Sequence, residues 1–241
     1  MLSVIVPVFN EAENIEPLVT EIAALKSRVP ILEIIYVNDG STDGTLAALR
    51  RMQTIEPSLR VVNQSPRSGQ SCATWSGVQA ATQPVCVTLD GDGQNDPEGI
   101  VQMFQTFMDA SRHTPHVMVA GQREKREDNI IRILSSRIAN TIRARILDDG
   151  VRDTGCALKM FRRDDYLALP YFNHMHRFLA ALFIRNGVTV RLSPVRHRPR
   201  TRGTSKYGVW NRVWVGIVDI FGVRWLQMRA RPVNLVVSED K

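Results

Sequence analysis

Strand-like and helix-like segments alternate through the first half of the chain, and no other feature constrains the fold as much. Short runs rich in Val, Ile and Leu are each followed by a longer stretch whose apolar residues recur with a helical period. Such alternation predicts an α/β fold, Rossmann-like, with a mostly parallel sheet flanked by helices. The expected strands are 2–9, 32–37, 59–62, 85–89 and 116–120, and the expected helices are 12–27, 42–53, 71–81 and 98–110.

After residue 121 the alternation becomes less regular and basic residues dominate. The elements expected there are strands over 156–161 and 188–192, helices over 130–147, 177–186 and 210–228, and a basic loop over 196–206. The arginines in or just beyond the first of these helices are Arg132, Arg137, Arg143, Arg145 and Arg152.

The charge of the chain is unevenly distributed. The first 122 residues contain 7 Lys and Arg against 13 Asp and Glu, whereas the remainder contains 24 against 11. A basic half favours phosphate-bearing partners, which include nucleic acid, anionic lipid and phosphorylated small molecules.

No segment is expected to span a membrane, because a span needs about 20 mostly apolar residues. The most apolar stretch, 209–228, contains Asn211, Arg212, Asp219 and Arg224. The first residues lack the basic start and cleavage site of a signal peptide. Three cysteines without CxxC spacing are expected to be small buried thiols in a reducing compartment. The expected location is therefore cytoplasmic, with any membrane contact peripheral.

The expected helix over 210–228 is amphipathic. Its broad apolar face would contain Trp210, Val213, Trp214, Ile217, Ile220, Phe221, Trp225 and Met228. Two interpretations remain open: the face packs on the protein core, or it lies in a membrane interface with aromatic side chains among the lipid headgroups.

The strongest chemical signal is the sequence Asp90-Gly91-Asp92-Gly93-Gln94, which directly follows a buried strand. Two carboxylates separated by one glycine can bind a hard cation, and Mg²⁺ in proteins commonly takes one or two carboxylates together with substrate phosphates. A calcium loop is not supported, because Asn95 and Val101 stand where that loop needs Gly and Glu. A plain Asp/Gly turn remains the alternative.

Two further motifs also follow strands, where α/β proteins bind ligands. Asp39 ends one strand and can accept hydrogen bonds from a base or ribose, while Ser41 or Thr42 can cap the next helix. The sequence PVFNE at residues 7–11 places an aromatic side chain among polar ones, which suits a base pocket or a simple strand end. Neither GxxxxGK nor GxGxxG is present, so an NTPase and a dinucleotide oxidoreductase are not supported.

Basic side chains form the fourth signal. Arg123 follows a strand, and Arg132 and Ser136 share a helix face. The basic loop adds Arg196, Arg198, Arg200, Arg202 and Lys206. Guanidinium groups bind phosphate in bidentate fashion, although a solvated charged surface is the ordinary alternative. His174 and His176 lack the neighbouring ligands that a metal pair would need.

Taken together, PVFNEAENI, VNDGSTDGT, LDGDGQNDP, DTGCALKMFRR and GTSKYG resemble glycosyltransferase family 2, and within it the dolichol- or polyprenyl-phosphate sugar synthases. The resemblance runs from Val4 to Gly208. It implies a GT-A fold, a GDP- or UDP-linked sugar donor, a divalent cation (Mg²⁺ or Mn²⁺) and inverting transfer. It divides the chain into a catalytic domain, 1–208, and an amphipathic, membrane-interfacial C-terminal segment, 209–241.

The resemblance also implies residue roles. The nucleotide-sugar would be bound by Pro7, Phe9, Glu11, Asp39, Asp90, Ser205 and Lys206. The metal would be bound by Asp90, Asp92 and Gln94, and the acceptor phosphate by Arg123, Arg132 and Ser136. Asp92, Arg123 and Arg132 would be catalytic. The chain departs from its apparent relatives in having Asn38 where an Asp often precedes Asp39, and none of its segments is expected to form the membrane-anchor helices that some of them carry.

The chemistry of the acceptor supports the same subgroup. A sugar hydroxyl needs a general base to remove its proton, whereas a phosphate monoester with a second pKa of about 6 is already a nucleophile at neutral pH.

The expected product is a polyprenyl-phosphate-linked monosaccharide for cell-envelope glycan or lipopolysaccharide modification. A glycan hydroxyl acceptor is the alternative. A non-enzymatic protein that binds nucleic acid or anionic membrane would leave the acidic motifs unexplained. Processive polysaccharide synthesis is disfavoured, because Phe221 replaces the Gln of their QxxRW motif.

Overall fold

The computed structural model describes residues 1–123, 143–151, 153–199 and 210–230, although it describes no side chains for 210–215. The strands are β1 (Leu2–Val8), β2 (Ile31–Asp39), β3 (Leu59–Gln64), β4 (Val85–Thr88), β5 (Val117–Arg123), β6 (Lys159–Arg162) and β7 (Thr189–Val195). The α-helices are α1 (Ala12–Ala24), α2 (Thr45–Ile55), α3 (Gln70–Ala80), α4 (Gly99–Ser111), α6 (Arg163–Leu167), α7 (Leu179–Arg185) and α8 (Trp210–Met228). Short 3₁₀ turns are η1 (Leu25–Ser27) and η2 (Met175–Arg177).

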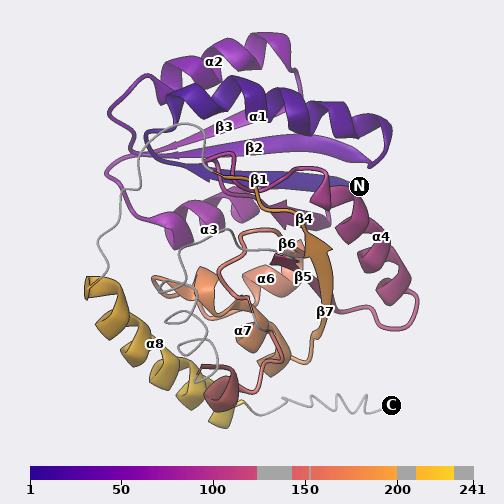
Figure 1. Cartoon of the computed structure of the whole chain (residues 1–241), viewed down its shortest axis with the longest axis vertical. Coiled ribbons are helices and arrows are strands. Elements are labelled where there is room, and N and C mark those ends of the chain that lie inside the picture. Colours follow the sequence, from indigo (N-terminus) through magenta and orange to yellow (C-terminus); the bar gives the residue numbers. More distant parts are fainter. Residues whose placement is uncertain (124–142, 152, 200–209, 231–241) are drawn as a thin grey trace, which may run out of the picture.

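The strands form one seven-stranded sheet in the order β3-β2-β1-β4-β6-β5-β7. β1 pairs in parallel with β2 and β4, β2 with β3, and β5 with β7. Only β6 runs the other way among the strands of the described residues, antiparallel to both β4 and β5. The mostly parallel α/β fold predicted from the alternating segments is therefore confirmed (Figure 1).

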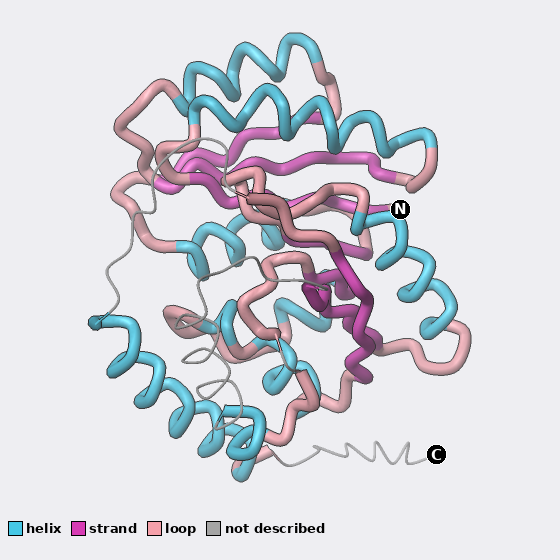
Figure 2. Tube along the Cα trace, in the orientation of Figure 1, coloured by secondary structure: helices cyan, strands magenta, loops and turns pink. Residues whose placement is uncertain are grey.

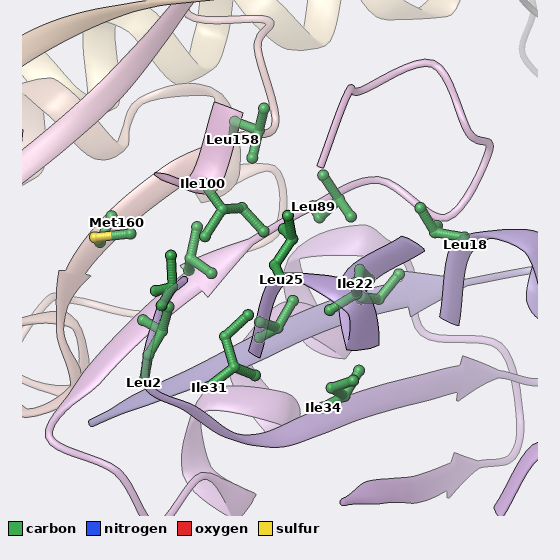
Figure 3. Packing of buried hydrophobic residues seen from close by; sticks show 14 of the residues in the cluster. Leu2, Leu18, Ile22, Leu25, Ile31, Ile34, Leu89, Ile100, Leu158 and Met160 are labelled. Atoms are coloured by element: carbon green, nitrogen blue, oxygen red, sulfur yellow. The ribbon is translucent and has the colours of Figure 1, made fainter. Parts of the chain in front are cut away.

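Apolar side chains on the two faces of the sheet form two separate cores. One core packs α1, α2 and α4 against the sheet, with Leu18, Ile22 and Ile100 among its buried residues (Figure 3). The other packs α3, α6, α7 and part of α8 against the opposite face. Figure 2 shows α1 and α2 on one side of the strands and α3 on the other. Because both faces are covered, the central strands are apolar on both sides.

Some element boundaries differ from the sequence prediction for local reasons. Helix α2 starts at Thr45 rather than at residue 42, because Oδ1 of Asp43 accepts a hydrogen bond from the Thr45 amide at 2.9 Å. Ser41 and Thr42 do not cap this helix; they bond to Asn10 in the neighbouring turn instead. The helix expected over 177–186 begins as the 3₁₀ turn η2, which follows the left-handed residue His174 (φ 68°).

Helix α8 divides its apolar residues between two faces. Val223 is buried, and Ile220 and Leu226 pack on the second core beside α7. The apolar side chains exposed on the outside of α8 are Ile217, Val218, Phe221, Trp225 and Met228. The single broad face drawn from the sequence is thus wrong in part, because Ile220 faces inward while Phe221, Trp225 and Met228 do not. In the part of the chain that the structure describes, no helix is long and apolar enough to cross a membrane.

Candidate active site at the carboxyl edge of the sheet

Three of the sequence motifs meet at one edge of the sheet. Because β2, β1 and β4 are parallel neighbours, their carboxyl ends lie side by side. Asp39 ends β2, residues 9–11 follow β1, and Asp90 follows β4. The turns after β1 and β2 are joined directly, since the Asn10 amide donates to Ser41 Oγ at 2.9 Å.

Asp39 is buried and both of its carboxylate oxygens accept hydrogen bonds. Oδ1 accepts from the Ser68 amide at 2.7 Å and Oδ2 from the Gly69 amide at 2.8 Å. Reasoning from the sequence missed this loop entirely. The only signal in the sequence was the glycine at position 69, because glycine is the residue that adopts positive φ most readily. In the structure its φ is +90°.

The loop before α3 also contacts two of the residues predicted to bind the base, through Arg67. Cζ of Arg67 lies 3.8 Å from the centroid of the Phe9 ring, and its Nε lies 3.9 Å from Oδ2 of Asp39. Pro7 on β1 and Glu11 just after it are half-buried, and Oε2 of Glu11 accepts a hydrogen bond from Nδ2 of Asn14 at 2.7 Å. Of the residues predicted to bind the nucleotide, Phe9 and Asp39 are therefore brought together by their contacts with Arg67.

The acidic motif forms a tight turn against β1. A Cβ at Gly91 would lie 2.3 Å from Cγ1 of Val8, so only glycine fits there. Oδ1 of Asp90 accepts a hydrogen bond from Nε2 of Gln70 at 2.7 Å, and Oδ1 of Asp92 accepts one from the Gln94 amide at 3.1 Å. Both aspartates are half-buried and reachable from solvent.

The donor set of this turn fits a hard divalent cation. Carboxylate oxygens of Asp90 and Asp92, with the side chain of Gln94 nearby in sequence, are ligands that Mg²⁺ and Mn²⁺ accept. Among the residues that the structure describes, no group of three His, Cys, Asp or Glu side chains could hold a metal. Mg²⁺ in proteins is commonly held by one or two carboxylates together with substrate phosphates and water.

Arg123 lies at the end of β5, on the same edge of the sheet. Its Nε and Nη2 donate to the two carboxylate oxygens of Asp153 at 2.5 and 2.7 Å, and both side chains are nearly buried. Such a bidentate pair fixes the plane of the guanidinium. The other residues predicted to bind the acceptor phosphate or the donor phosphates, Arg132, Ser136, Ser205 and Lys206, lie outside the described residues.

Lys159 is a buried cation at this edge that sequence reasoning also missed. It opens β6 opposite Thr88 of β4, and its ammonium donates to the carbonyls of Thr154 and Cys156. Burial lowers the pKa of Lys159, while attraction to Asp90 and Asp153 counteracts part of that shift. Lys159 stands in the segment DTGCALK, so its place in a shared motif was the signal available.

Two further basic residues of the second half, Arg198 of the expected basic loop and Arg143 of the expected helix over 130–147, have acidic partners within the fold. Arg198 pairs with Glu21 at 2.6 Å and with Asp96 at 2.8 Å, and its amide donates to the Gln94 carbonyl at 2.8 Å. Arg143 is buried against Asp149. Arg198 and Arg143, like Arg123, are therefore paired with carboxylates, and part of the charge of the basic half is balanced within the fold.

The two histidines of the HMH segment have different partners. His176 Nδ1 lies 2.7 Å from the hydroxyl of Ser71 in α3, whereas His174 Nδ1 lies 3.5 Å from Oδ2 of Asp219 in α8. The histidines therefore connect two helices to the same turn.

Solved structures of two sugar-transferring synthases superpose on this fold. Glucosyl-3-phosphoglycerate synthase from Mycobacterium tuberculosis, solved with Mn²⁺, UDP and glucosyl-3-phosphoglycerate, superposes with a TM-score of 0.71 over 96% of this chain and 81% of its own, at 16% identity. Mannosyl-3-phosphoglycerate synthase from Rubrobacter xylanophilus gives 0.69 over 100% and 78%, at 15% identity. The fold is that of the GT-A glycosyltransferases.

Sequence comparison narrows the class to a family. The profile of glycosyl transferase family 2 matches residues 3–169, and this chain belongs to that family. Dodecaprenyl-phosphate galacturonate synthase of Rhizobium johnstonii is 33% identical over 236 residues, which are 96% of this chain and 69% of that protein. Undecaprenyl-phosphate 4-deoxy-4-formamido-L-arabinose transferase of Edwardsiella ictaluri is 30% identical over 214 residues, 86% of this chain and 63% of that protein. The chain thus spans about two thirds of the length of these relatives.

Proposed function

We propose that this protein is an inverting, metal-dependent glycosyltransferase that moves a sugar from a GDP- or UDP-linked donor to polyprenyl phosphate. The product would be a polyprenyl-phosphate-linked monosaccharide for cell-envelope glycan or lipopolysaccharide modification. The observation that carries the proposal is the 33% identity, over 96% of this chain, to a relative named for the same kind of acceptor.

The donor would lie across the ends of β2, β1 and β4. Its base would contact Asp39 between Phe9, Pro7 and Glu11, and its diphosphate would reach Asp90 and, outside the described residues, Ser205 and Lys206. Asp90, Asp92 and Gln94 would hold Mg²⁺ or Mn²⁺. When bound, a divalent cation neutralises charge that develops on a departing diphosphate.

The acceptor would approach from the side of β5. Arg123 and, outside the described residues, Arg132 and Ser136 would position its phosphate. A phosphate oxygen attacks the anomeric carbon as the bond to the donor diphosphate breaks, and the electron pair of that bond leaves with the nucleoside diphosphate. The phosphate needs no general base, since it is largely ionised at neutral pH. Attack opposite the leaving group converts an α-linked donor into a β-linked product.

The outer face of α8 would contact the membrane that contains the lipid acceptor. Val218, Phe221 and Trp225 are 68%, 63% and 54% exposed, and Arg224 on the same helix is exposed as well. Apolar and aromatic side chains beside a cation are typical of helices that lie in the interface of an anionic bilayer. The protein would therefore work as a peripheral protein on the cytoplasmic face of the membrane.

A transfer assay tests this proposal. The purified chain is incubated with radiolabelled UDP- and GDP-sugars, Mn²⁺ or Mg²⁺, and undecaprenyl phosphate in detergent, with undecaprenol as the matched acceptor that lacks phosphate. Label is expected in lipid only with the phosphate and only with the cation. Absence of labelled lipid with every common donor would contradict the proposal, and label in a soluble sugar acceptor would favour transfer to a hydroxyl group.

A further inference from the structure

Three consecutive residues before and at the start of α3 hold two carboxylates that come from different strands. The amides of Ser68 and Gly69 donate to Asp39 at the end of β2, at 2.7 and 2.8 Å. The side chain of the next residue, Gln70, donates to Oδ1 of Asp90 after β4 at 2.7 Å. Because β1 lies between β2 and β4, this loop connects positions that the sheet keeps apart.

The loop that connects Asp39 with Asp90 is closely packed. A Cβ at Gly40 would lie only 2.8 Å from the Arg67 amide nitrogen, so the start of the loop packs directly on the turn after Asp39. Gly69 is in a left-handed conformation, with φ +90°. At the other end Gln70 begins α3, and its carbonyl accepts a hydrogen bond from the Thr74 hydroxyl at 2.8 Å. Residues 67–70 are therefore closely packed between the turn after Asp39 and the first turn of α3.

The hydrogen bond from Gln70 affects how Asp90 can orient toward a cation. A side-chain amide that donates to one carboxylate oxygen restricts rotation of the carboxylate, and partners of this kind orient metal ligands and raise their affinity. Gln70 contributes a donor without adding charge, so it does not compete electrostatically with a cation.

We propose that Gln70 is a positioning residue for the divalent cation, and that residues 67–70, the bracket, make nucleoside binding at Asp39 and cation binding at Asp90 mutually dependent. This inference rests on the proposed function for the identity of both ligands. A base that contacts Asp39 selects the arrangement in which the Ser68 and Gly69 amides are engaged, and that arrangement also seats Gln70 on Asp90. By thermodynamic reciprocity, the cation then tightens nucleoside binding by the same factor.

The test uses nucleosides, because they lack the diphosphate that would bridge to the cation directly. Mn²⁺ binding to the full chain is measured by electron paramagnetic resonance with and without saturating uridine or guanosine. We expect one of the two nucleosides to lower the Mn²⁺ Kd by about fivefold or more, the small end of typical coupling. Gln70→Leu, which keeps the size but removes the donor, should raise the Mn²⁺ Kd about tenfold and abolish the nucleoside effect.

The matched control is Gln79→Leu, on the exposed face of the same helix; it should leave both quantities unchanged. If Gln70→Leu does not fold, as judged by circular dichroism, Gln70→Asn, whose shorter side chain withdraws the amide from Asp90, is measured in its place with the same expectation. Unchanged Mn²⁺ affinity and unchanged coupling in the Gln70 variant would overturn the bracket while leaving the proposed function intact. Mn²⁺ binding that no nucleoside affects in the wild type would overturn it as well. Failure of the wild type to bind Mn²⁺ at all would overturn both.

Discussion

Strand β2 carries a buried carboxylate near each end, Glu33 and Asp39, and the two have different kinds of hydrogen-bond partners. Near the amino end, Glu33 accepts from the Ser3 hydroxyl at 2.6 Å, from the Thr82 amide at 2.6 Å and from Arg60 at 2.5 Å. At the carboxyl end, Asp39 accepts from backbone amides of a loop that also reaches Asp90. Glu33 is hydrogen-bonded to residues of other strands, whereas Asp39, equally buried, lies at the edge of the sheet that also carries the half-exposed acids Asp90 and Asp92.

The two carboxylates of β2 also differ in what stabilises the acids around them. Burial raises the pKa of Glu33, but hydrogen bonds from Ser3, Thr82 and Arg60 outweigh burial and leave the pKa lowered. The ionised form is thus stabilised by the fold itself. At the other edge, Asp90 and Asp92 remain reachable from solvent, so an external cation can add to their stabilisation.

The largest effect should come from Asp92→Asn at the carboxyl end. The proposed function makes Asp92 a ligand of the cation, and Asn in its place keeps an oxygen but loses the negative charge, so transfer activity should fall by about a thousandfold, or about 4 kcal/mol of barrier. Stability to urea should change little, because Asp92 is half-exposed. The measurement is initial rate at saturating Mn²⁺ together with a urea unfolding curve. Retained turnover would refute the role of Asp92.

Glu33→Ala should show the reverse pattern. It leaves the Ser3 hydroxyl and the Thr82 amide without their acceptor, which should cost about 3 kcal/mol of unfolding free energy. The rate of transfer at temperatures well below the melting point should be unaffected. Glu98→Ala is the control, because its pair with Arg28 is exposed and contributes little. A large loss of activity in folded Glu33→Ala would show that the two ends are coupled.

A smaller effect is expected on the outer face of α8. Phe221→Ala should weaken binding to vesicles of anionic phospholipid about tenfold, because a partly inserted aromatic ring loses its burial in the bilayer. Ile55→Ala on α2 is a matched control, since Ile55 is 65% exposed and Phe221 is 63% exposed. Sedimentation with vesicles gives both affinities, and equal losses for the two variants would argue against α8 as the membrane contact.

The smallest effect is the acid sensitivity of the amino end. Since the folded-state pKa of Glu33 is lowered from 4.5, its stabilisation is present above that value and is lost as the pH falls through the folded-state pKa. The stability difference between wild type and Glu33→Gln should therefore be constant near neutral pH and shrink below about pH 4.5. Urea titrations across that range measure it. A difference that persists unchanged to low pH would show that charge is not the cause.

The sequence allowed the edge of the site to be predicted, because parallel neighbours must end together. The sequence placed Asp39, Phe9 and Asp90 each after a strand of a mostly parallel sheet, where ligands bind, and the structure adds that the three strands are neighbours. The bracket could not be predicted, since the contacts of Asp39 with Ser68 and Gly69 join residues far apart in sequence and involve main-chain amides that any residue supplies.

Charge was the least reliable guide. Arg198 was expected to bind phosphate, yet its partner Glu21 lies on α1, far away in sequence, and no local pattern reveals that pair. The faces of α8 were misjudged for a related reason. A helical wheel orders residues around an axis but does not say which of two apolar arcs meets the body of the protein, and here Val223 does.

The reversed direction of β6 has a topological consequence. Because β5 ends and β6 begins at the same edge, the chain leaves the sheet at Arg123 and is held again at Asp153, and these two side chains are bonded to each other. The Arg123–Asp153 pair therefore closes the chain on itself at this edge, so the guanidinium of Arg123 is held by a residue 30 positions further along. An insertion or deletion between these two residues would leave the pairing of β5 with β6 unchanged, because neither strand lies between them.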